Sequence, residues 1–247
     1  MALKTLLNYS PNFNSKKRVP KQIKFIIFHY TGMKKESDAI NRLTDIQSEV
    51  SCHYVIKNNG GIVKIIPDLY IAWHAGKSSW KNYKSLNQNS IGIEITNPGH
   101  QFGYKKFSKK QISSLLKLSK FLIKKYKIEP KNILGHSDIA PQRKKDPGEN
   151  FPWEYLCKNK IGIWHTLKKQ ELIKNRKFKI SNIEEGFFFN NLFKIGYSKQ
   201  FPKNIDKAEY FRQLVKTFQR RFRQELVNGK IDQECLLISN NLIKTYS

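Results

Sequence analysis

The sequence predicts an α/β fold, in which helices flank a mixed β-sheet, followed by a small three-helix unit. Two observations indicate this fold. Short apolar runs rich in β-branched residues alternate with helical patterns over the first two thirds of the chain. From about Lys168 onward, every periodic segment is helical. We therefore expect the 247 residues to form two domains, residues 1–168 and residues 169–247.

The expected elements follow from local patterns. The run of residues 23–28 is short, β-branched and aromatic, so we expect a buried strand that ends just before His29. Residues 58–61 separate two further apolar runs, and because Asn and Gly readily adopt positive φ angles they predict a hairpin. A polar loop reaching Asn89 is long enough to form the rim of a cleft. In chain order we expect strands at 23–28, 52–57, 62–66, 71–76, 90–96 and 131–136, and helices at 37–50, at 108–127 and from about Phe151.

The segment 90–96 has the clearest strand alternation in the chain. Its three isoleucines share one face, whereas Glu94 lies on the other face beside Gly92, which leaves space next to it. A carboxylate in the middle of a strand is unusual, because strands disfavour Glu and sheet cores disfavour charge. We interpret Glu94 as a functional residue, and the alternative is the solvated face of an edge strand.

Three helices are expected in the second domain, over residues 181–195 and 206–225 and after Asp232. The middle one carries four apolar side chains on a single stripe: Phe211, Val215, Phe218 and Phe222. Such a unit buries a small core and contains no cluster of catalytic groups. We interpret it as a binding or docking module, and a purely structural appendage is the alternative.

The chain is strongly basic. It has 46 Lys and Arg against 19 Asp and Glu, a net charge of +27, with a pI of about 10.0. Such a charge attracts polyanions in general, including nucleic acid and anionic lipid. The lysines are scattered through every segment and no nucleic-acid-reading motif accompanies them. We therefore expect no specific nucleic-acid partner, and we interpret the charge mainly as solvated surface.

Cysteines and apolar runs give further limits. Cys52, Cys157 and Cys235 are an odd number without C-x-x-C spacing, so neither a disulfide framework nor a thiolate metal site is indicated. No apolar run reaches the roughly 18 residues of a membrane span. The apolar run at the N-terminus is shorter than the roughly 7 to 15 residues of a signal peptide, which favours a cytoplasmic location. The sequence gives no indication of oligomeric state.

Two histidines and one aspartate form a candidate metal site. His136 ends the last expected strand, and Asp146 returns through a loop that contains a proline. His29 lies at the C-terminal end of a strand, where open α/β sheets place their ligand crevices. A catalytic zinc takes three protein ligands and leaves its fourth position open. One such histidine alone is more often a hydrogen-bonded residue than a ligand, but two of them with a loop aspartate favour a zinc site.

Six short motifs follow one another in the first domain: Phe-His-Tyr-Thr at 28–31, Ser-Cys-His-Tyr at 51–54, Ala-Trp-His-Ala-Gly at 72–76, Asn-Ser-Ile-Gly-Ile-Glu at 89–94, Gly-His-Ser-Asp-Ile-Ala-Pro at 135–141 and Asp-Pro-Gly at 146–148. In this order they resemble the zinc-dependent N-acetylmuramoyl-L-alanine amidases of the amidase-2 group, which are related in fold to peptidoglycan recognition proteins. The resemblance covers roughly residues 21–156 and is highly specific. More weakly, residues 214–222 resemble part of a three-helix peptidoglycan-binding domain.

The resemblance implies roles for individual residues. It makes His29, His136 and Asp146 the ligands of one zinc ion. It also places Glu94 on the catalytic acid of the family, and Lys144 on its charge-stabilising lysine. Glu94 is then expected to take a proton from the attacking water and to pass it to the leaving amine, while Lys144 stabilises the developing oxyanion.

The implied activity is hydrolysis of the amide bond between N-acetylmuramic acid, with the 1,6-anhydro form as one candidate, and L-alanine in peptidoglycan or muropeptides. The alternative is a non-catalytic peptidoglycan-binding protein on the same fold. His74 is expected to line the substrate groove beside Trp73, although a structural role is the stronger interpretation for His74 and for His53. Lys145 is the alternative to the neighbouring lysine as the oxyanion partner. A substrate-binding tail also makes a periplasmic or wall-associated location an alternative to the cytoplasm.

Overall fold

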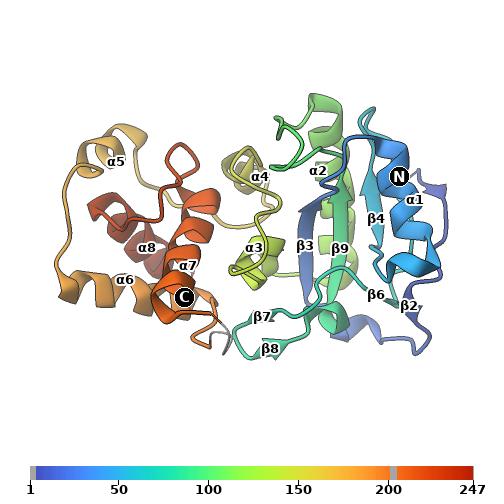
Figure 1. Cartoon of the computed structure of the whole chain (residues 1–247), viewed down its shortest axis with the longest axis horizontal. Coiled ribbons are helices and arrows are strands. Elements are labelled where there is room, and N and C mark those ends of the chain that lie inside the picture. The colour runs from blue at the N-terminus through green and yellow to red at the C-terminus, as the bar shows by residue number, and fades with distance from the viewer. Residues whose placement is uncertain (1–3, 201–204, 247) are drawn as a thin grey trace.

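A six-stranded mixed sheet forms the centre of the N-terminal part of the molecule (Figure 1). The computed structural model describes residues 4–200 and 205–246. The strand order is β1-β5-β4-β9-β3-β10, in which only the β4–β5 pair is antiparallel. The strands are β1 (Leu6–Leu7), β3 (Phe25–Tyr30), β4 (Tyr54–Ile56), β5 (Ile62–Lys64), β9 (Ser90–Ile95) and β10 (Ile133–Gly135). Two small antiparallel pairs, β2 (Phe13–Asn14) with β6 (Ile71–Ala72) and β7 (Ser79–Trp80) with β8 (Tyr83–Lys84), complete the strands.

One face of the sheet is covered by helix α2 (Lys109–Tyr126). The helix begins at a capping box, in which the Ser108 hydroxyl accepts from the Gln111 amide while the Gln111 side chain accepts from the Ser108 amide. Its apolar stripe packs against the buried isoleucines of β9 and the even-numbered residues of β3. This packing confirms the alternation predicted for the segment 90–96.

The opposite face of the central strands carries two polar candidate site residues, His29 and Glu94. In the β3–β9 register His29 is the partner of Glu94, so both side chains extend from the same face of the sheet. Strand β9 lies between β4 and β3. The alternative that Glu94 belongs to an edge strand is therefore wrong, because the strand is paired on both sides.

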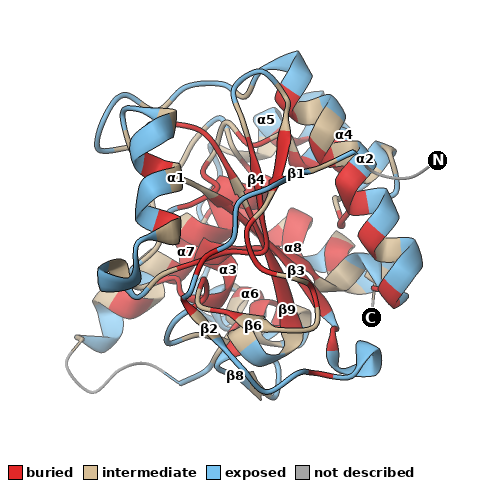
Figure 2. Cartoon of the chain, turned by 90° about the vertical axis from the view of Figure 1, so that its right-hand side faces the viewer, coloured by how far each residue is buried: buried red, intermediate tan, exposed pale blue. Residues whose placement is uncertain are grey.

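Shorter helices surround this second face. Figure 2 shows the central strands buried and the outward sides of the helices exposed. Helix α1 is shorter than the predicted 37–50, because it ends at Thr44 and the chain continues as a 3-10 turn. The last strand also ends earlier than predicted, at Gly135, so that His136 is the first residue of a short helix. The helices on this face are α1 (Glu36–Thr44) and α3 (His136–Ile139), whereas α4 (Trp153–Lys158) packs with α2 on the first face.

The described residues of the C-terminal part form four helices: α5 (Lys169–Asn175), α6 (Asn182–Ile195), α7 (Lys207–Phe222) and α8 (Gln233–Tyr246). The prediction of three helices was wrong by one, since it omitted α5. That helix has seven residues, lacks a side-chain cap and buries only Leu172, so its sequence pattern is weak. None of the helices in the described ranges is long and apolar enough to cross a bilayer.

The hydrophobic core is continuous between the two parts of the chain. Phe25, Ile27 and Leu134 of the sheet belong to the same buried cluster as Phe188 of α6 and Phe218 of α7. In Figure 1, α3 and α4 lie between the sheet and helices α5–α8. A domain boundary at residue 168 stays a prediction, and the packing across that boundary matters for the site described next.

Candidate active site

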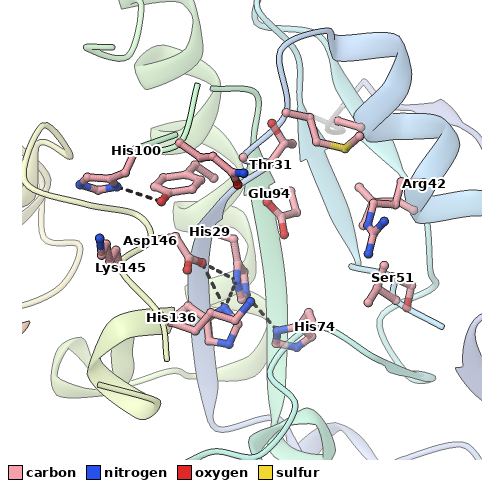
Figure 3. A pocket seen from close by; sticks show the side chains of 18 of the residues that line it. His29, Thr31, Arg42, Ser51, His74, Glu94, His100, His136, Lys145 and Asp146 are labelled. Atoms are coloured by element: carbon pink, nitrogen blue, oxygen red, sulfur yellow. Dashed lines mark hydrogen bonds and ion pairs between the residues drawn. The ribbon is translucent and has the colours of Figure 1, made fainter. Parts of the chain in front are cut away.

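His29, His136 and Asp146 come together at one end of the central strands (Figure 3). The His29 Nδ1 atom lies 2.9 Å from His136 Nδ1 and 3.0 Å from Asp146 Oδ2, and His136 Nδ1 lies 3.1 Å from the same carboxylate oxygen. All three residues are buried. Among the residues that the structure describes, they are the one cluster of His, Cys, Asp or Glu side chains with a geometry able to hold a metal ion.

The sheet topology explains why these residues meet. Strands β3 and β10 are parallel neighbours, with Phe28 opposite Gly135, so His29 and His136 follow at the same edge of the sheet. The loop after α3 then returns to this edge. The Ser137 amide donates to the backbone carbonyl of Asp146 at 2.8 Å, which fixes the carboxylate beside both histidines.

The hydrogen bonds of the Nε2 atoms of His29 and His136 determine the tautomer of each ring, and so whether Nδ1 carries a proton or a lone pair. His136 Nε2 lies 3.1 Å from the carbonyl of Ala75, an acceptor only, so Nε2 carries the proton and Nδ1 a lone pair. The Ser90 hydroxyl donates to the Leu86 carbonyl and so accepts from His74 Nε2 at 3.1 Å. His74 Nδ1 then accepts from His29 Nε2 at 3.0 Å. Both ligand candidates therefore direct an unprotonated Nδ1 to the same point, which is the pattern of metal-binding histidines.

The charges agree with this assignment. Burial, and next the neighbouring His136, lower the pKa of His29 to about 4, so its ring is neutral at physiological pH. Burial alone would raise the pKa of Asp146, but its close contacts with His136 and His29 hold that pKa well below its usual range. Neutral imidazoles and an ionised carboxylate are the forms that bind a metal cation.

Glu94 lies on the same face of the sheet, beside this cluster (Figure 3). Its carboxyl group sits deep in the site, where desolvation and the charge of Asp146 raise its pKa to about 8, against the opposing effect of Lys144. The Oε2 atom has no hydrogen-bond partner among the described residues. An acid with a raised pKa and a free oxygen is suited to exchange a proton with a bound molecule.

A cavity of about 510 Å³ opens over these groups. Lys144 and Lys145 line it from the loop that carries Asp146. The structure thus brings Lys144 into the same cavity as the predicted ligands and Glu94. Other lining residues are Tyr30, Thr31, Met33, Arg42, Trp73, His74 and His100.

His74 has a position that the sequence did not specify. It reaches the cavity wall, but its ring is buried and bonded to His29 and Ser90. Gly92 gives it room, because a Cβ atom there would lie 2.4 Å from the His74 ring. Sequence reasoning missed Ser90, although the alternation of β9 places it on the same face as Gly92 and Glu94. His53 lies deeper and accepts from the Gly92 amide at 3.0 Å, which is a structural contact.

This fold and this cluster are suited to a hydrolase that binds a metal ion, since a buried acid lies next to three convergent ligand atoms. A family model described as N-acetylmuramoyl-L-alanine amidase, Amidase_2, matches residues 19–149. The chain belongs to this family.

Two relatives illustrate the similarity in sequence. The N-acetylmuramoyl-L-alanine amidase AmiD of Escherichia coli strain K12 is 34% identical over 237 residues, which is 91% of this chain and 84% of that protein. The 1,6-anhydro-N-acetylmuramyl-L-alanine amidase AmpD of Haemophilus influenzae is 32% identical over 163 residues, 59% of this chain and 86% of that protein.

Solved structures agree in fold. Escherichia coli AmiD, in complex with the substrate anhydro-N-acetylmuramic acid-L-Ala-D-gamma-Glu-L-Lys, superposes with a TM-score of 0.79 at 32% identity, covering 91% of this chain and 90% of that one. AmpDh3 of Pseudomonas aeruginosa gives a TM-score of 0.78 at 29% identity, with 96% and 97% covered. Both similarities extend over the C-terminal helices as well as the sheet.

Proposed function

We propose that this chain hydrolyses the amide bond between N-acetylmuramic acid and L-alanine in peptidoglycan or muropeptides, with one zinc ion bound by His29, His136 and Asp146. The observation that carries the proposal is the convergence of three free ligand atoms beside Glu94. Family membership and a similarity to AmiD that covers 91% of this chain support it. The 1,6-anhydro form of the sugar is the first substrate to test, because it is the form in the AmiD complex.

The donor set suits zinc. Two imidazole nitrogens and one carboxylate oxygen are three protein ligands of the types zinc prefers, and they leave a fourth position open to the cavity. Softer metals favour thiolates, and none of the three cysteines takes part in the cluster. When bound, zinc supplies a Lewis acid that polarises the scissile carbonyl and lowers the pKa of water.

Glu94 moves the proton in this proposal. Its carboxylate takes a proton from the water that attacks the carbonyl carbon, and the resulting acid protonates the nitrogen of L-alanine as the C–N bond breaks. A raised pKa helps the second step, because the group then retains its proton until the amine leaves. The positive charge of a bound zinc lowers this pKa again and favours the first step.

Lys144 supplies the compensating charge. The tetrahedral intermediate carries a negative oxygen, and Lys144 lines the same cavity as Asp146. A cation fixed where charge develops stabilises the transition state more than the ground state. Lys145 lines the same cavity, so the two lysines are compared directly by replacing each with methionine and measuring kcat.

The test is product analysis by mass spectrometry. The purified, zinc-loaded protein is incubated with an anhydro-muropeptide and with its reducing-end counterpart, with and without EDTA, and then with zinc restored. We expect release of the free peptide, loss of release in EDTA and recovery with zinc. Binding of the muropeptide without any release would instead support the non-catalytic alternative, and release that persists after exhaustive EDTA dialysis would contradict the zinc site.

A further inference from the structure

Two consecutive arginines at the end of α7 reach from the C-terminal helices into the α/β part. The guanidinium of Arg221 donates from Nη1 to Asp138 Oδ2 at 2.5 Å and from Nη2 to the Ile133 carbonyl at 3.0 Å. It also lies 4.4 Å from the centre of the Trp153 ring. The side chains of Arg221 and Asp138 are only 3% and 1% exposed, so this ion pair is fully buried between the two parts of the chain.

Asp138 connects this arginine to the candidate metal ligands. It lies in α3, two residues after His136, and its Oδ2 atom accepts from the Gly135 amide at 2.7 Å, which closes the first turn of that helix. Its other oxygen, Oδ1, accepts from the Tyr197 hydroxyl at 2.8 Å. Both carboxylate oxygens of Asp138 are thus bonded to groups from the C-terminal part, and the backbone they fix is the one that carries His136.

The neighbouring Arg220 reaches the other end of the same loop. Its Nε atom lies 3.9 Å from Glu149 Oε2, and the same oxygen is 3.0 Å from His100 Nε2. Two residues beyond Glu149, the carbonyl of Phe151 accepts from the Gln224 side chain at 2.6 Å. The C-terminal end of α7 and the residues just after it therefore contact the segment 136–151 on both sides of Asp146.

This segment needs such support. It carries two of the three candidate ligands, yet apart from the four residues of α3 it contains no helix or strand. A metal site requires ligand atoms that are held to within about 0.5 Å, and that precision comes from the groups behind the ligands. In Figure 1, α3 lies directly between α7 and strand β3, so α7 supports the segment from behind.

We propose that Arg221 is a positioning residue of the metal site, acting through Asp138 on His136, and that α7 is part of the active-site scaffold and not a separable appendage. The proposal deepens the proposed function, since it rests on the same metal site. It gives the C-terminal helices a second role, distinct from the predicted contact with peptidoglycan. The residue to be tested lies outside the cavity and touches neither the predicted ligands nor the substrate space.

The chain contains a matched control, Arg223. Its side chain is 1% exposed and forms ion pairs with Asp232 and Glu234, both within the C-terminal part. Arg221→Met and Arg223→Met each remove one buried arginine from the same turn of chain and each leave a buried carboxylate unpaired. Both variants are expected to lower the melting temperature. Only the first is expected to change the metal site.

The experiment measures zinc affinity of the full-length proteins by competition with a chromophoric chelator. We expect Arg221→Met to bind zinc about 10- to 100-fold more weakly than the wild type, and Arg223→Met to stay within about twofold. The absorption spectrum of the cobalt(II)-substituted protein should change for the Arg221 variant alone. Arg221→Lys keeps the charge near Asp138 and should recover part of the affinity.

The proposal is overturned if folded Arg221→Met binds zinc as tightly as the wild type, or if both variants lose affinity equally. Should Arg221→Met fail to fold, Arg221→Lys and Tyr197→Phe decide, because both weaken the bonds to Asp138 with a smaller change of volume. Unchanged zinc affinity in both variants would also overturn the proposal. Wild-type zinc affinity is measured first and separately from turnover. Absence of zinc binding in the wild type would be a failure of the proposed function and not of this inference.

Discussion

For Glu94, the sequence pattern and the structure agree that the side chain lies on the functional face of the sheet. The alternation of the segment 90–96 places it opposite the isoleucine face, and the register of β9 places it next to His29. Its free Oε2 atom and its raised pKa, about 8, both require an environment that a surface glutamate does not have. The combination favours proton transfer over a structural role.

Replacing Glu94 by Gln tests that role. The amide has nearly the same shape but exchanges no proton, so we expect kcat on an anhydro-muropeptide to fall by about 10²- to 10⁴-fold. Zinc content, measured by plasma mass spectrometry, should stay at one ion per chain, because Glu94 is not a ligand. Glu129→Gln, an exposed glutamate after α2, serves as the control. An active, zinc-loaded Glu94→Gln variant would remove Glu94 from the mechanism.

His74 is expected to act on the metal through His29. Its Nδ1 atom accepts the proton of His29 Nε2, which orients the ring and keeps its other nitrogen free. In His74→Phe the ring volume remains and the acceptor is lost, so zinc affinity should fall by about 10-fold or more. Calorimetric titration with zinc checks this. If zinc affinity is unchanged while KM rises, His74 contacts substrate instead.

At the scale of elements, the patterns of two strands made the positions of His29 and Glu94 predictable. The pattern of residues 23–28 predicted a buried strand with His29 at its end, and the observed strand β3 extends two residues further, to Tyr30. The alternation of segment 90–96 predicted that Glu94 lies on the face opposite the isoleucines. These inferences need only local pattern. The proline-containing loop after His136 pointed to Asp146 as a third ligand, and the motif resemblance added Lys144, which no periodicity marks.

The support behind the site was not predictable in this way. The Arg221–Asp138 pair joins residues 83 positions apart, and helical periodicity in α7 identifies only its apolar stripe. Both arginines at the end of α7 look like ordinary C-terminal charges of a helix. Their burial depends on how the helical unit packs on α3, which is a tertiary property. For the same reason the separate domain expected from residue 169 onward shares its core with the sheet.

Strand β9 offers a test of close packing. A methyl group at Gly92 would lie 2.4 Å from the His74 ring, so Gly92→Ala must displace either the strand or the histidine. We expect a loss of about 1 to 3 kcal/mol in the free energy of unfolding, measured in urea, together with weaker zinc binding. Gly186→Ala in α6 is the control, since nothing lies within 4 Å of its added methyl group. There, stability should rise by up to about 1 kcal/mol. Unchanged stability in Gly92→Ala would show that the His74 pocket is looser than the structure indicates.

At the scale of the whole molecule, buried neutral histidines make the protein sensitive to acid. Burial is the main cause that lowers the pKa of His29 to about 4 and of His53 to about 3, and it holds the pKa of His74 well below 6.5. In the unfolded chain these rings bind protons near pH 6.5. Between pH 6.5 and about 4 the unfolded state therefore takes up protons that the folded state excludes. The free energy of unfolding decreases as the pH is lowered through this range.

Urea unfolding of the metal-stripped protein at pH 7.5, 6.5, 5.0 and 4.0 measures this effect. The free energy of unfolding should be nearly constant between pH 7.5 and 6.5 and then fall, with His29 alone contributing a loss on the order of 3 kcal/mol by pH 4. Zinc in excess should raise the value at pH 7.5, because a ligand that binds only the folded state stabilises it by RT ln(1 + [L]/Kd). That increment should itself shrink on acidification, since protons compete with zinc for the two Nδ1 atoms. A metal-stripped protein that is equally stable at pH 7.5 and 5.0 would mean that these histidines are solvated, and it would remove the electrostatic basis of the site.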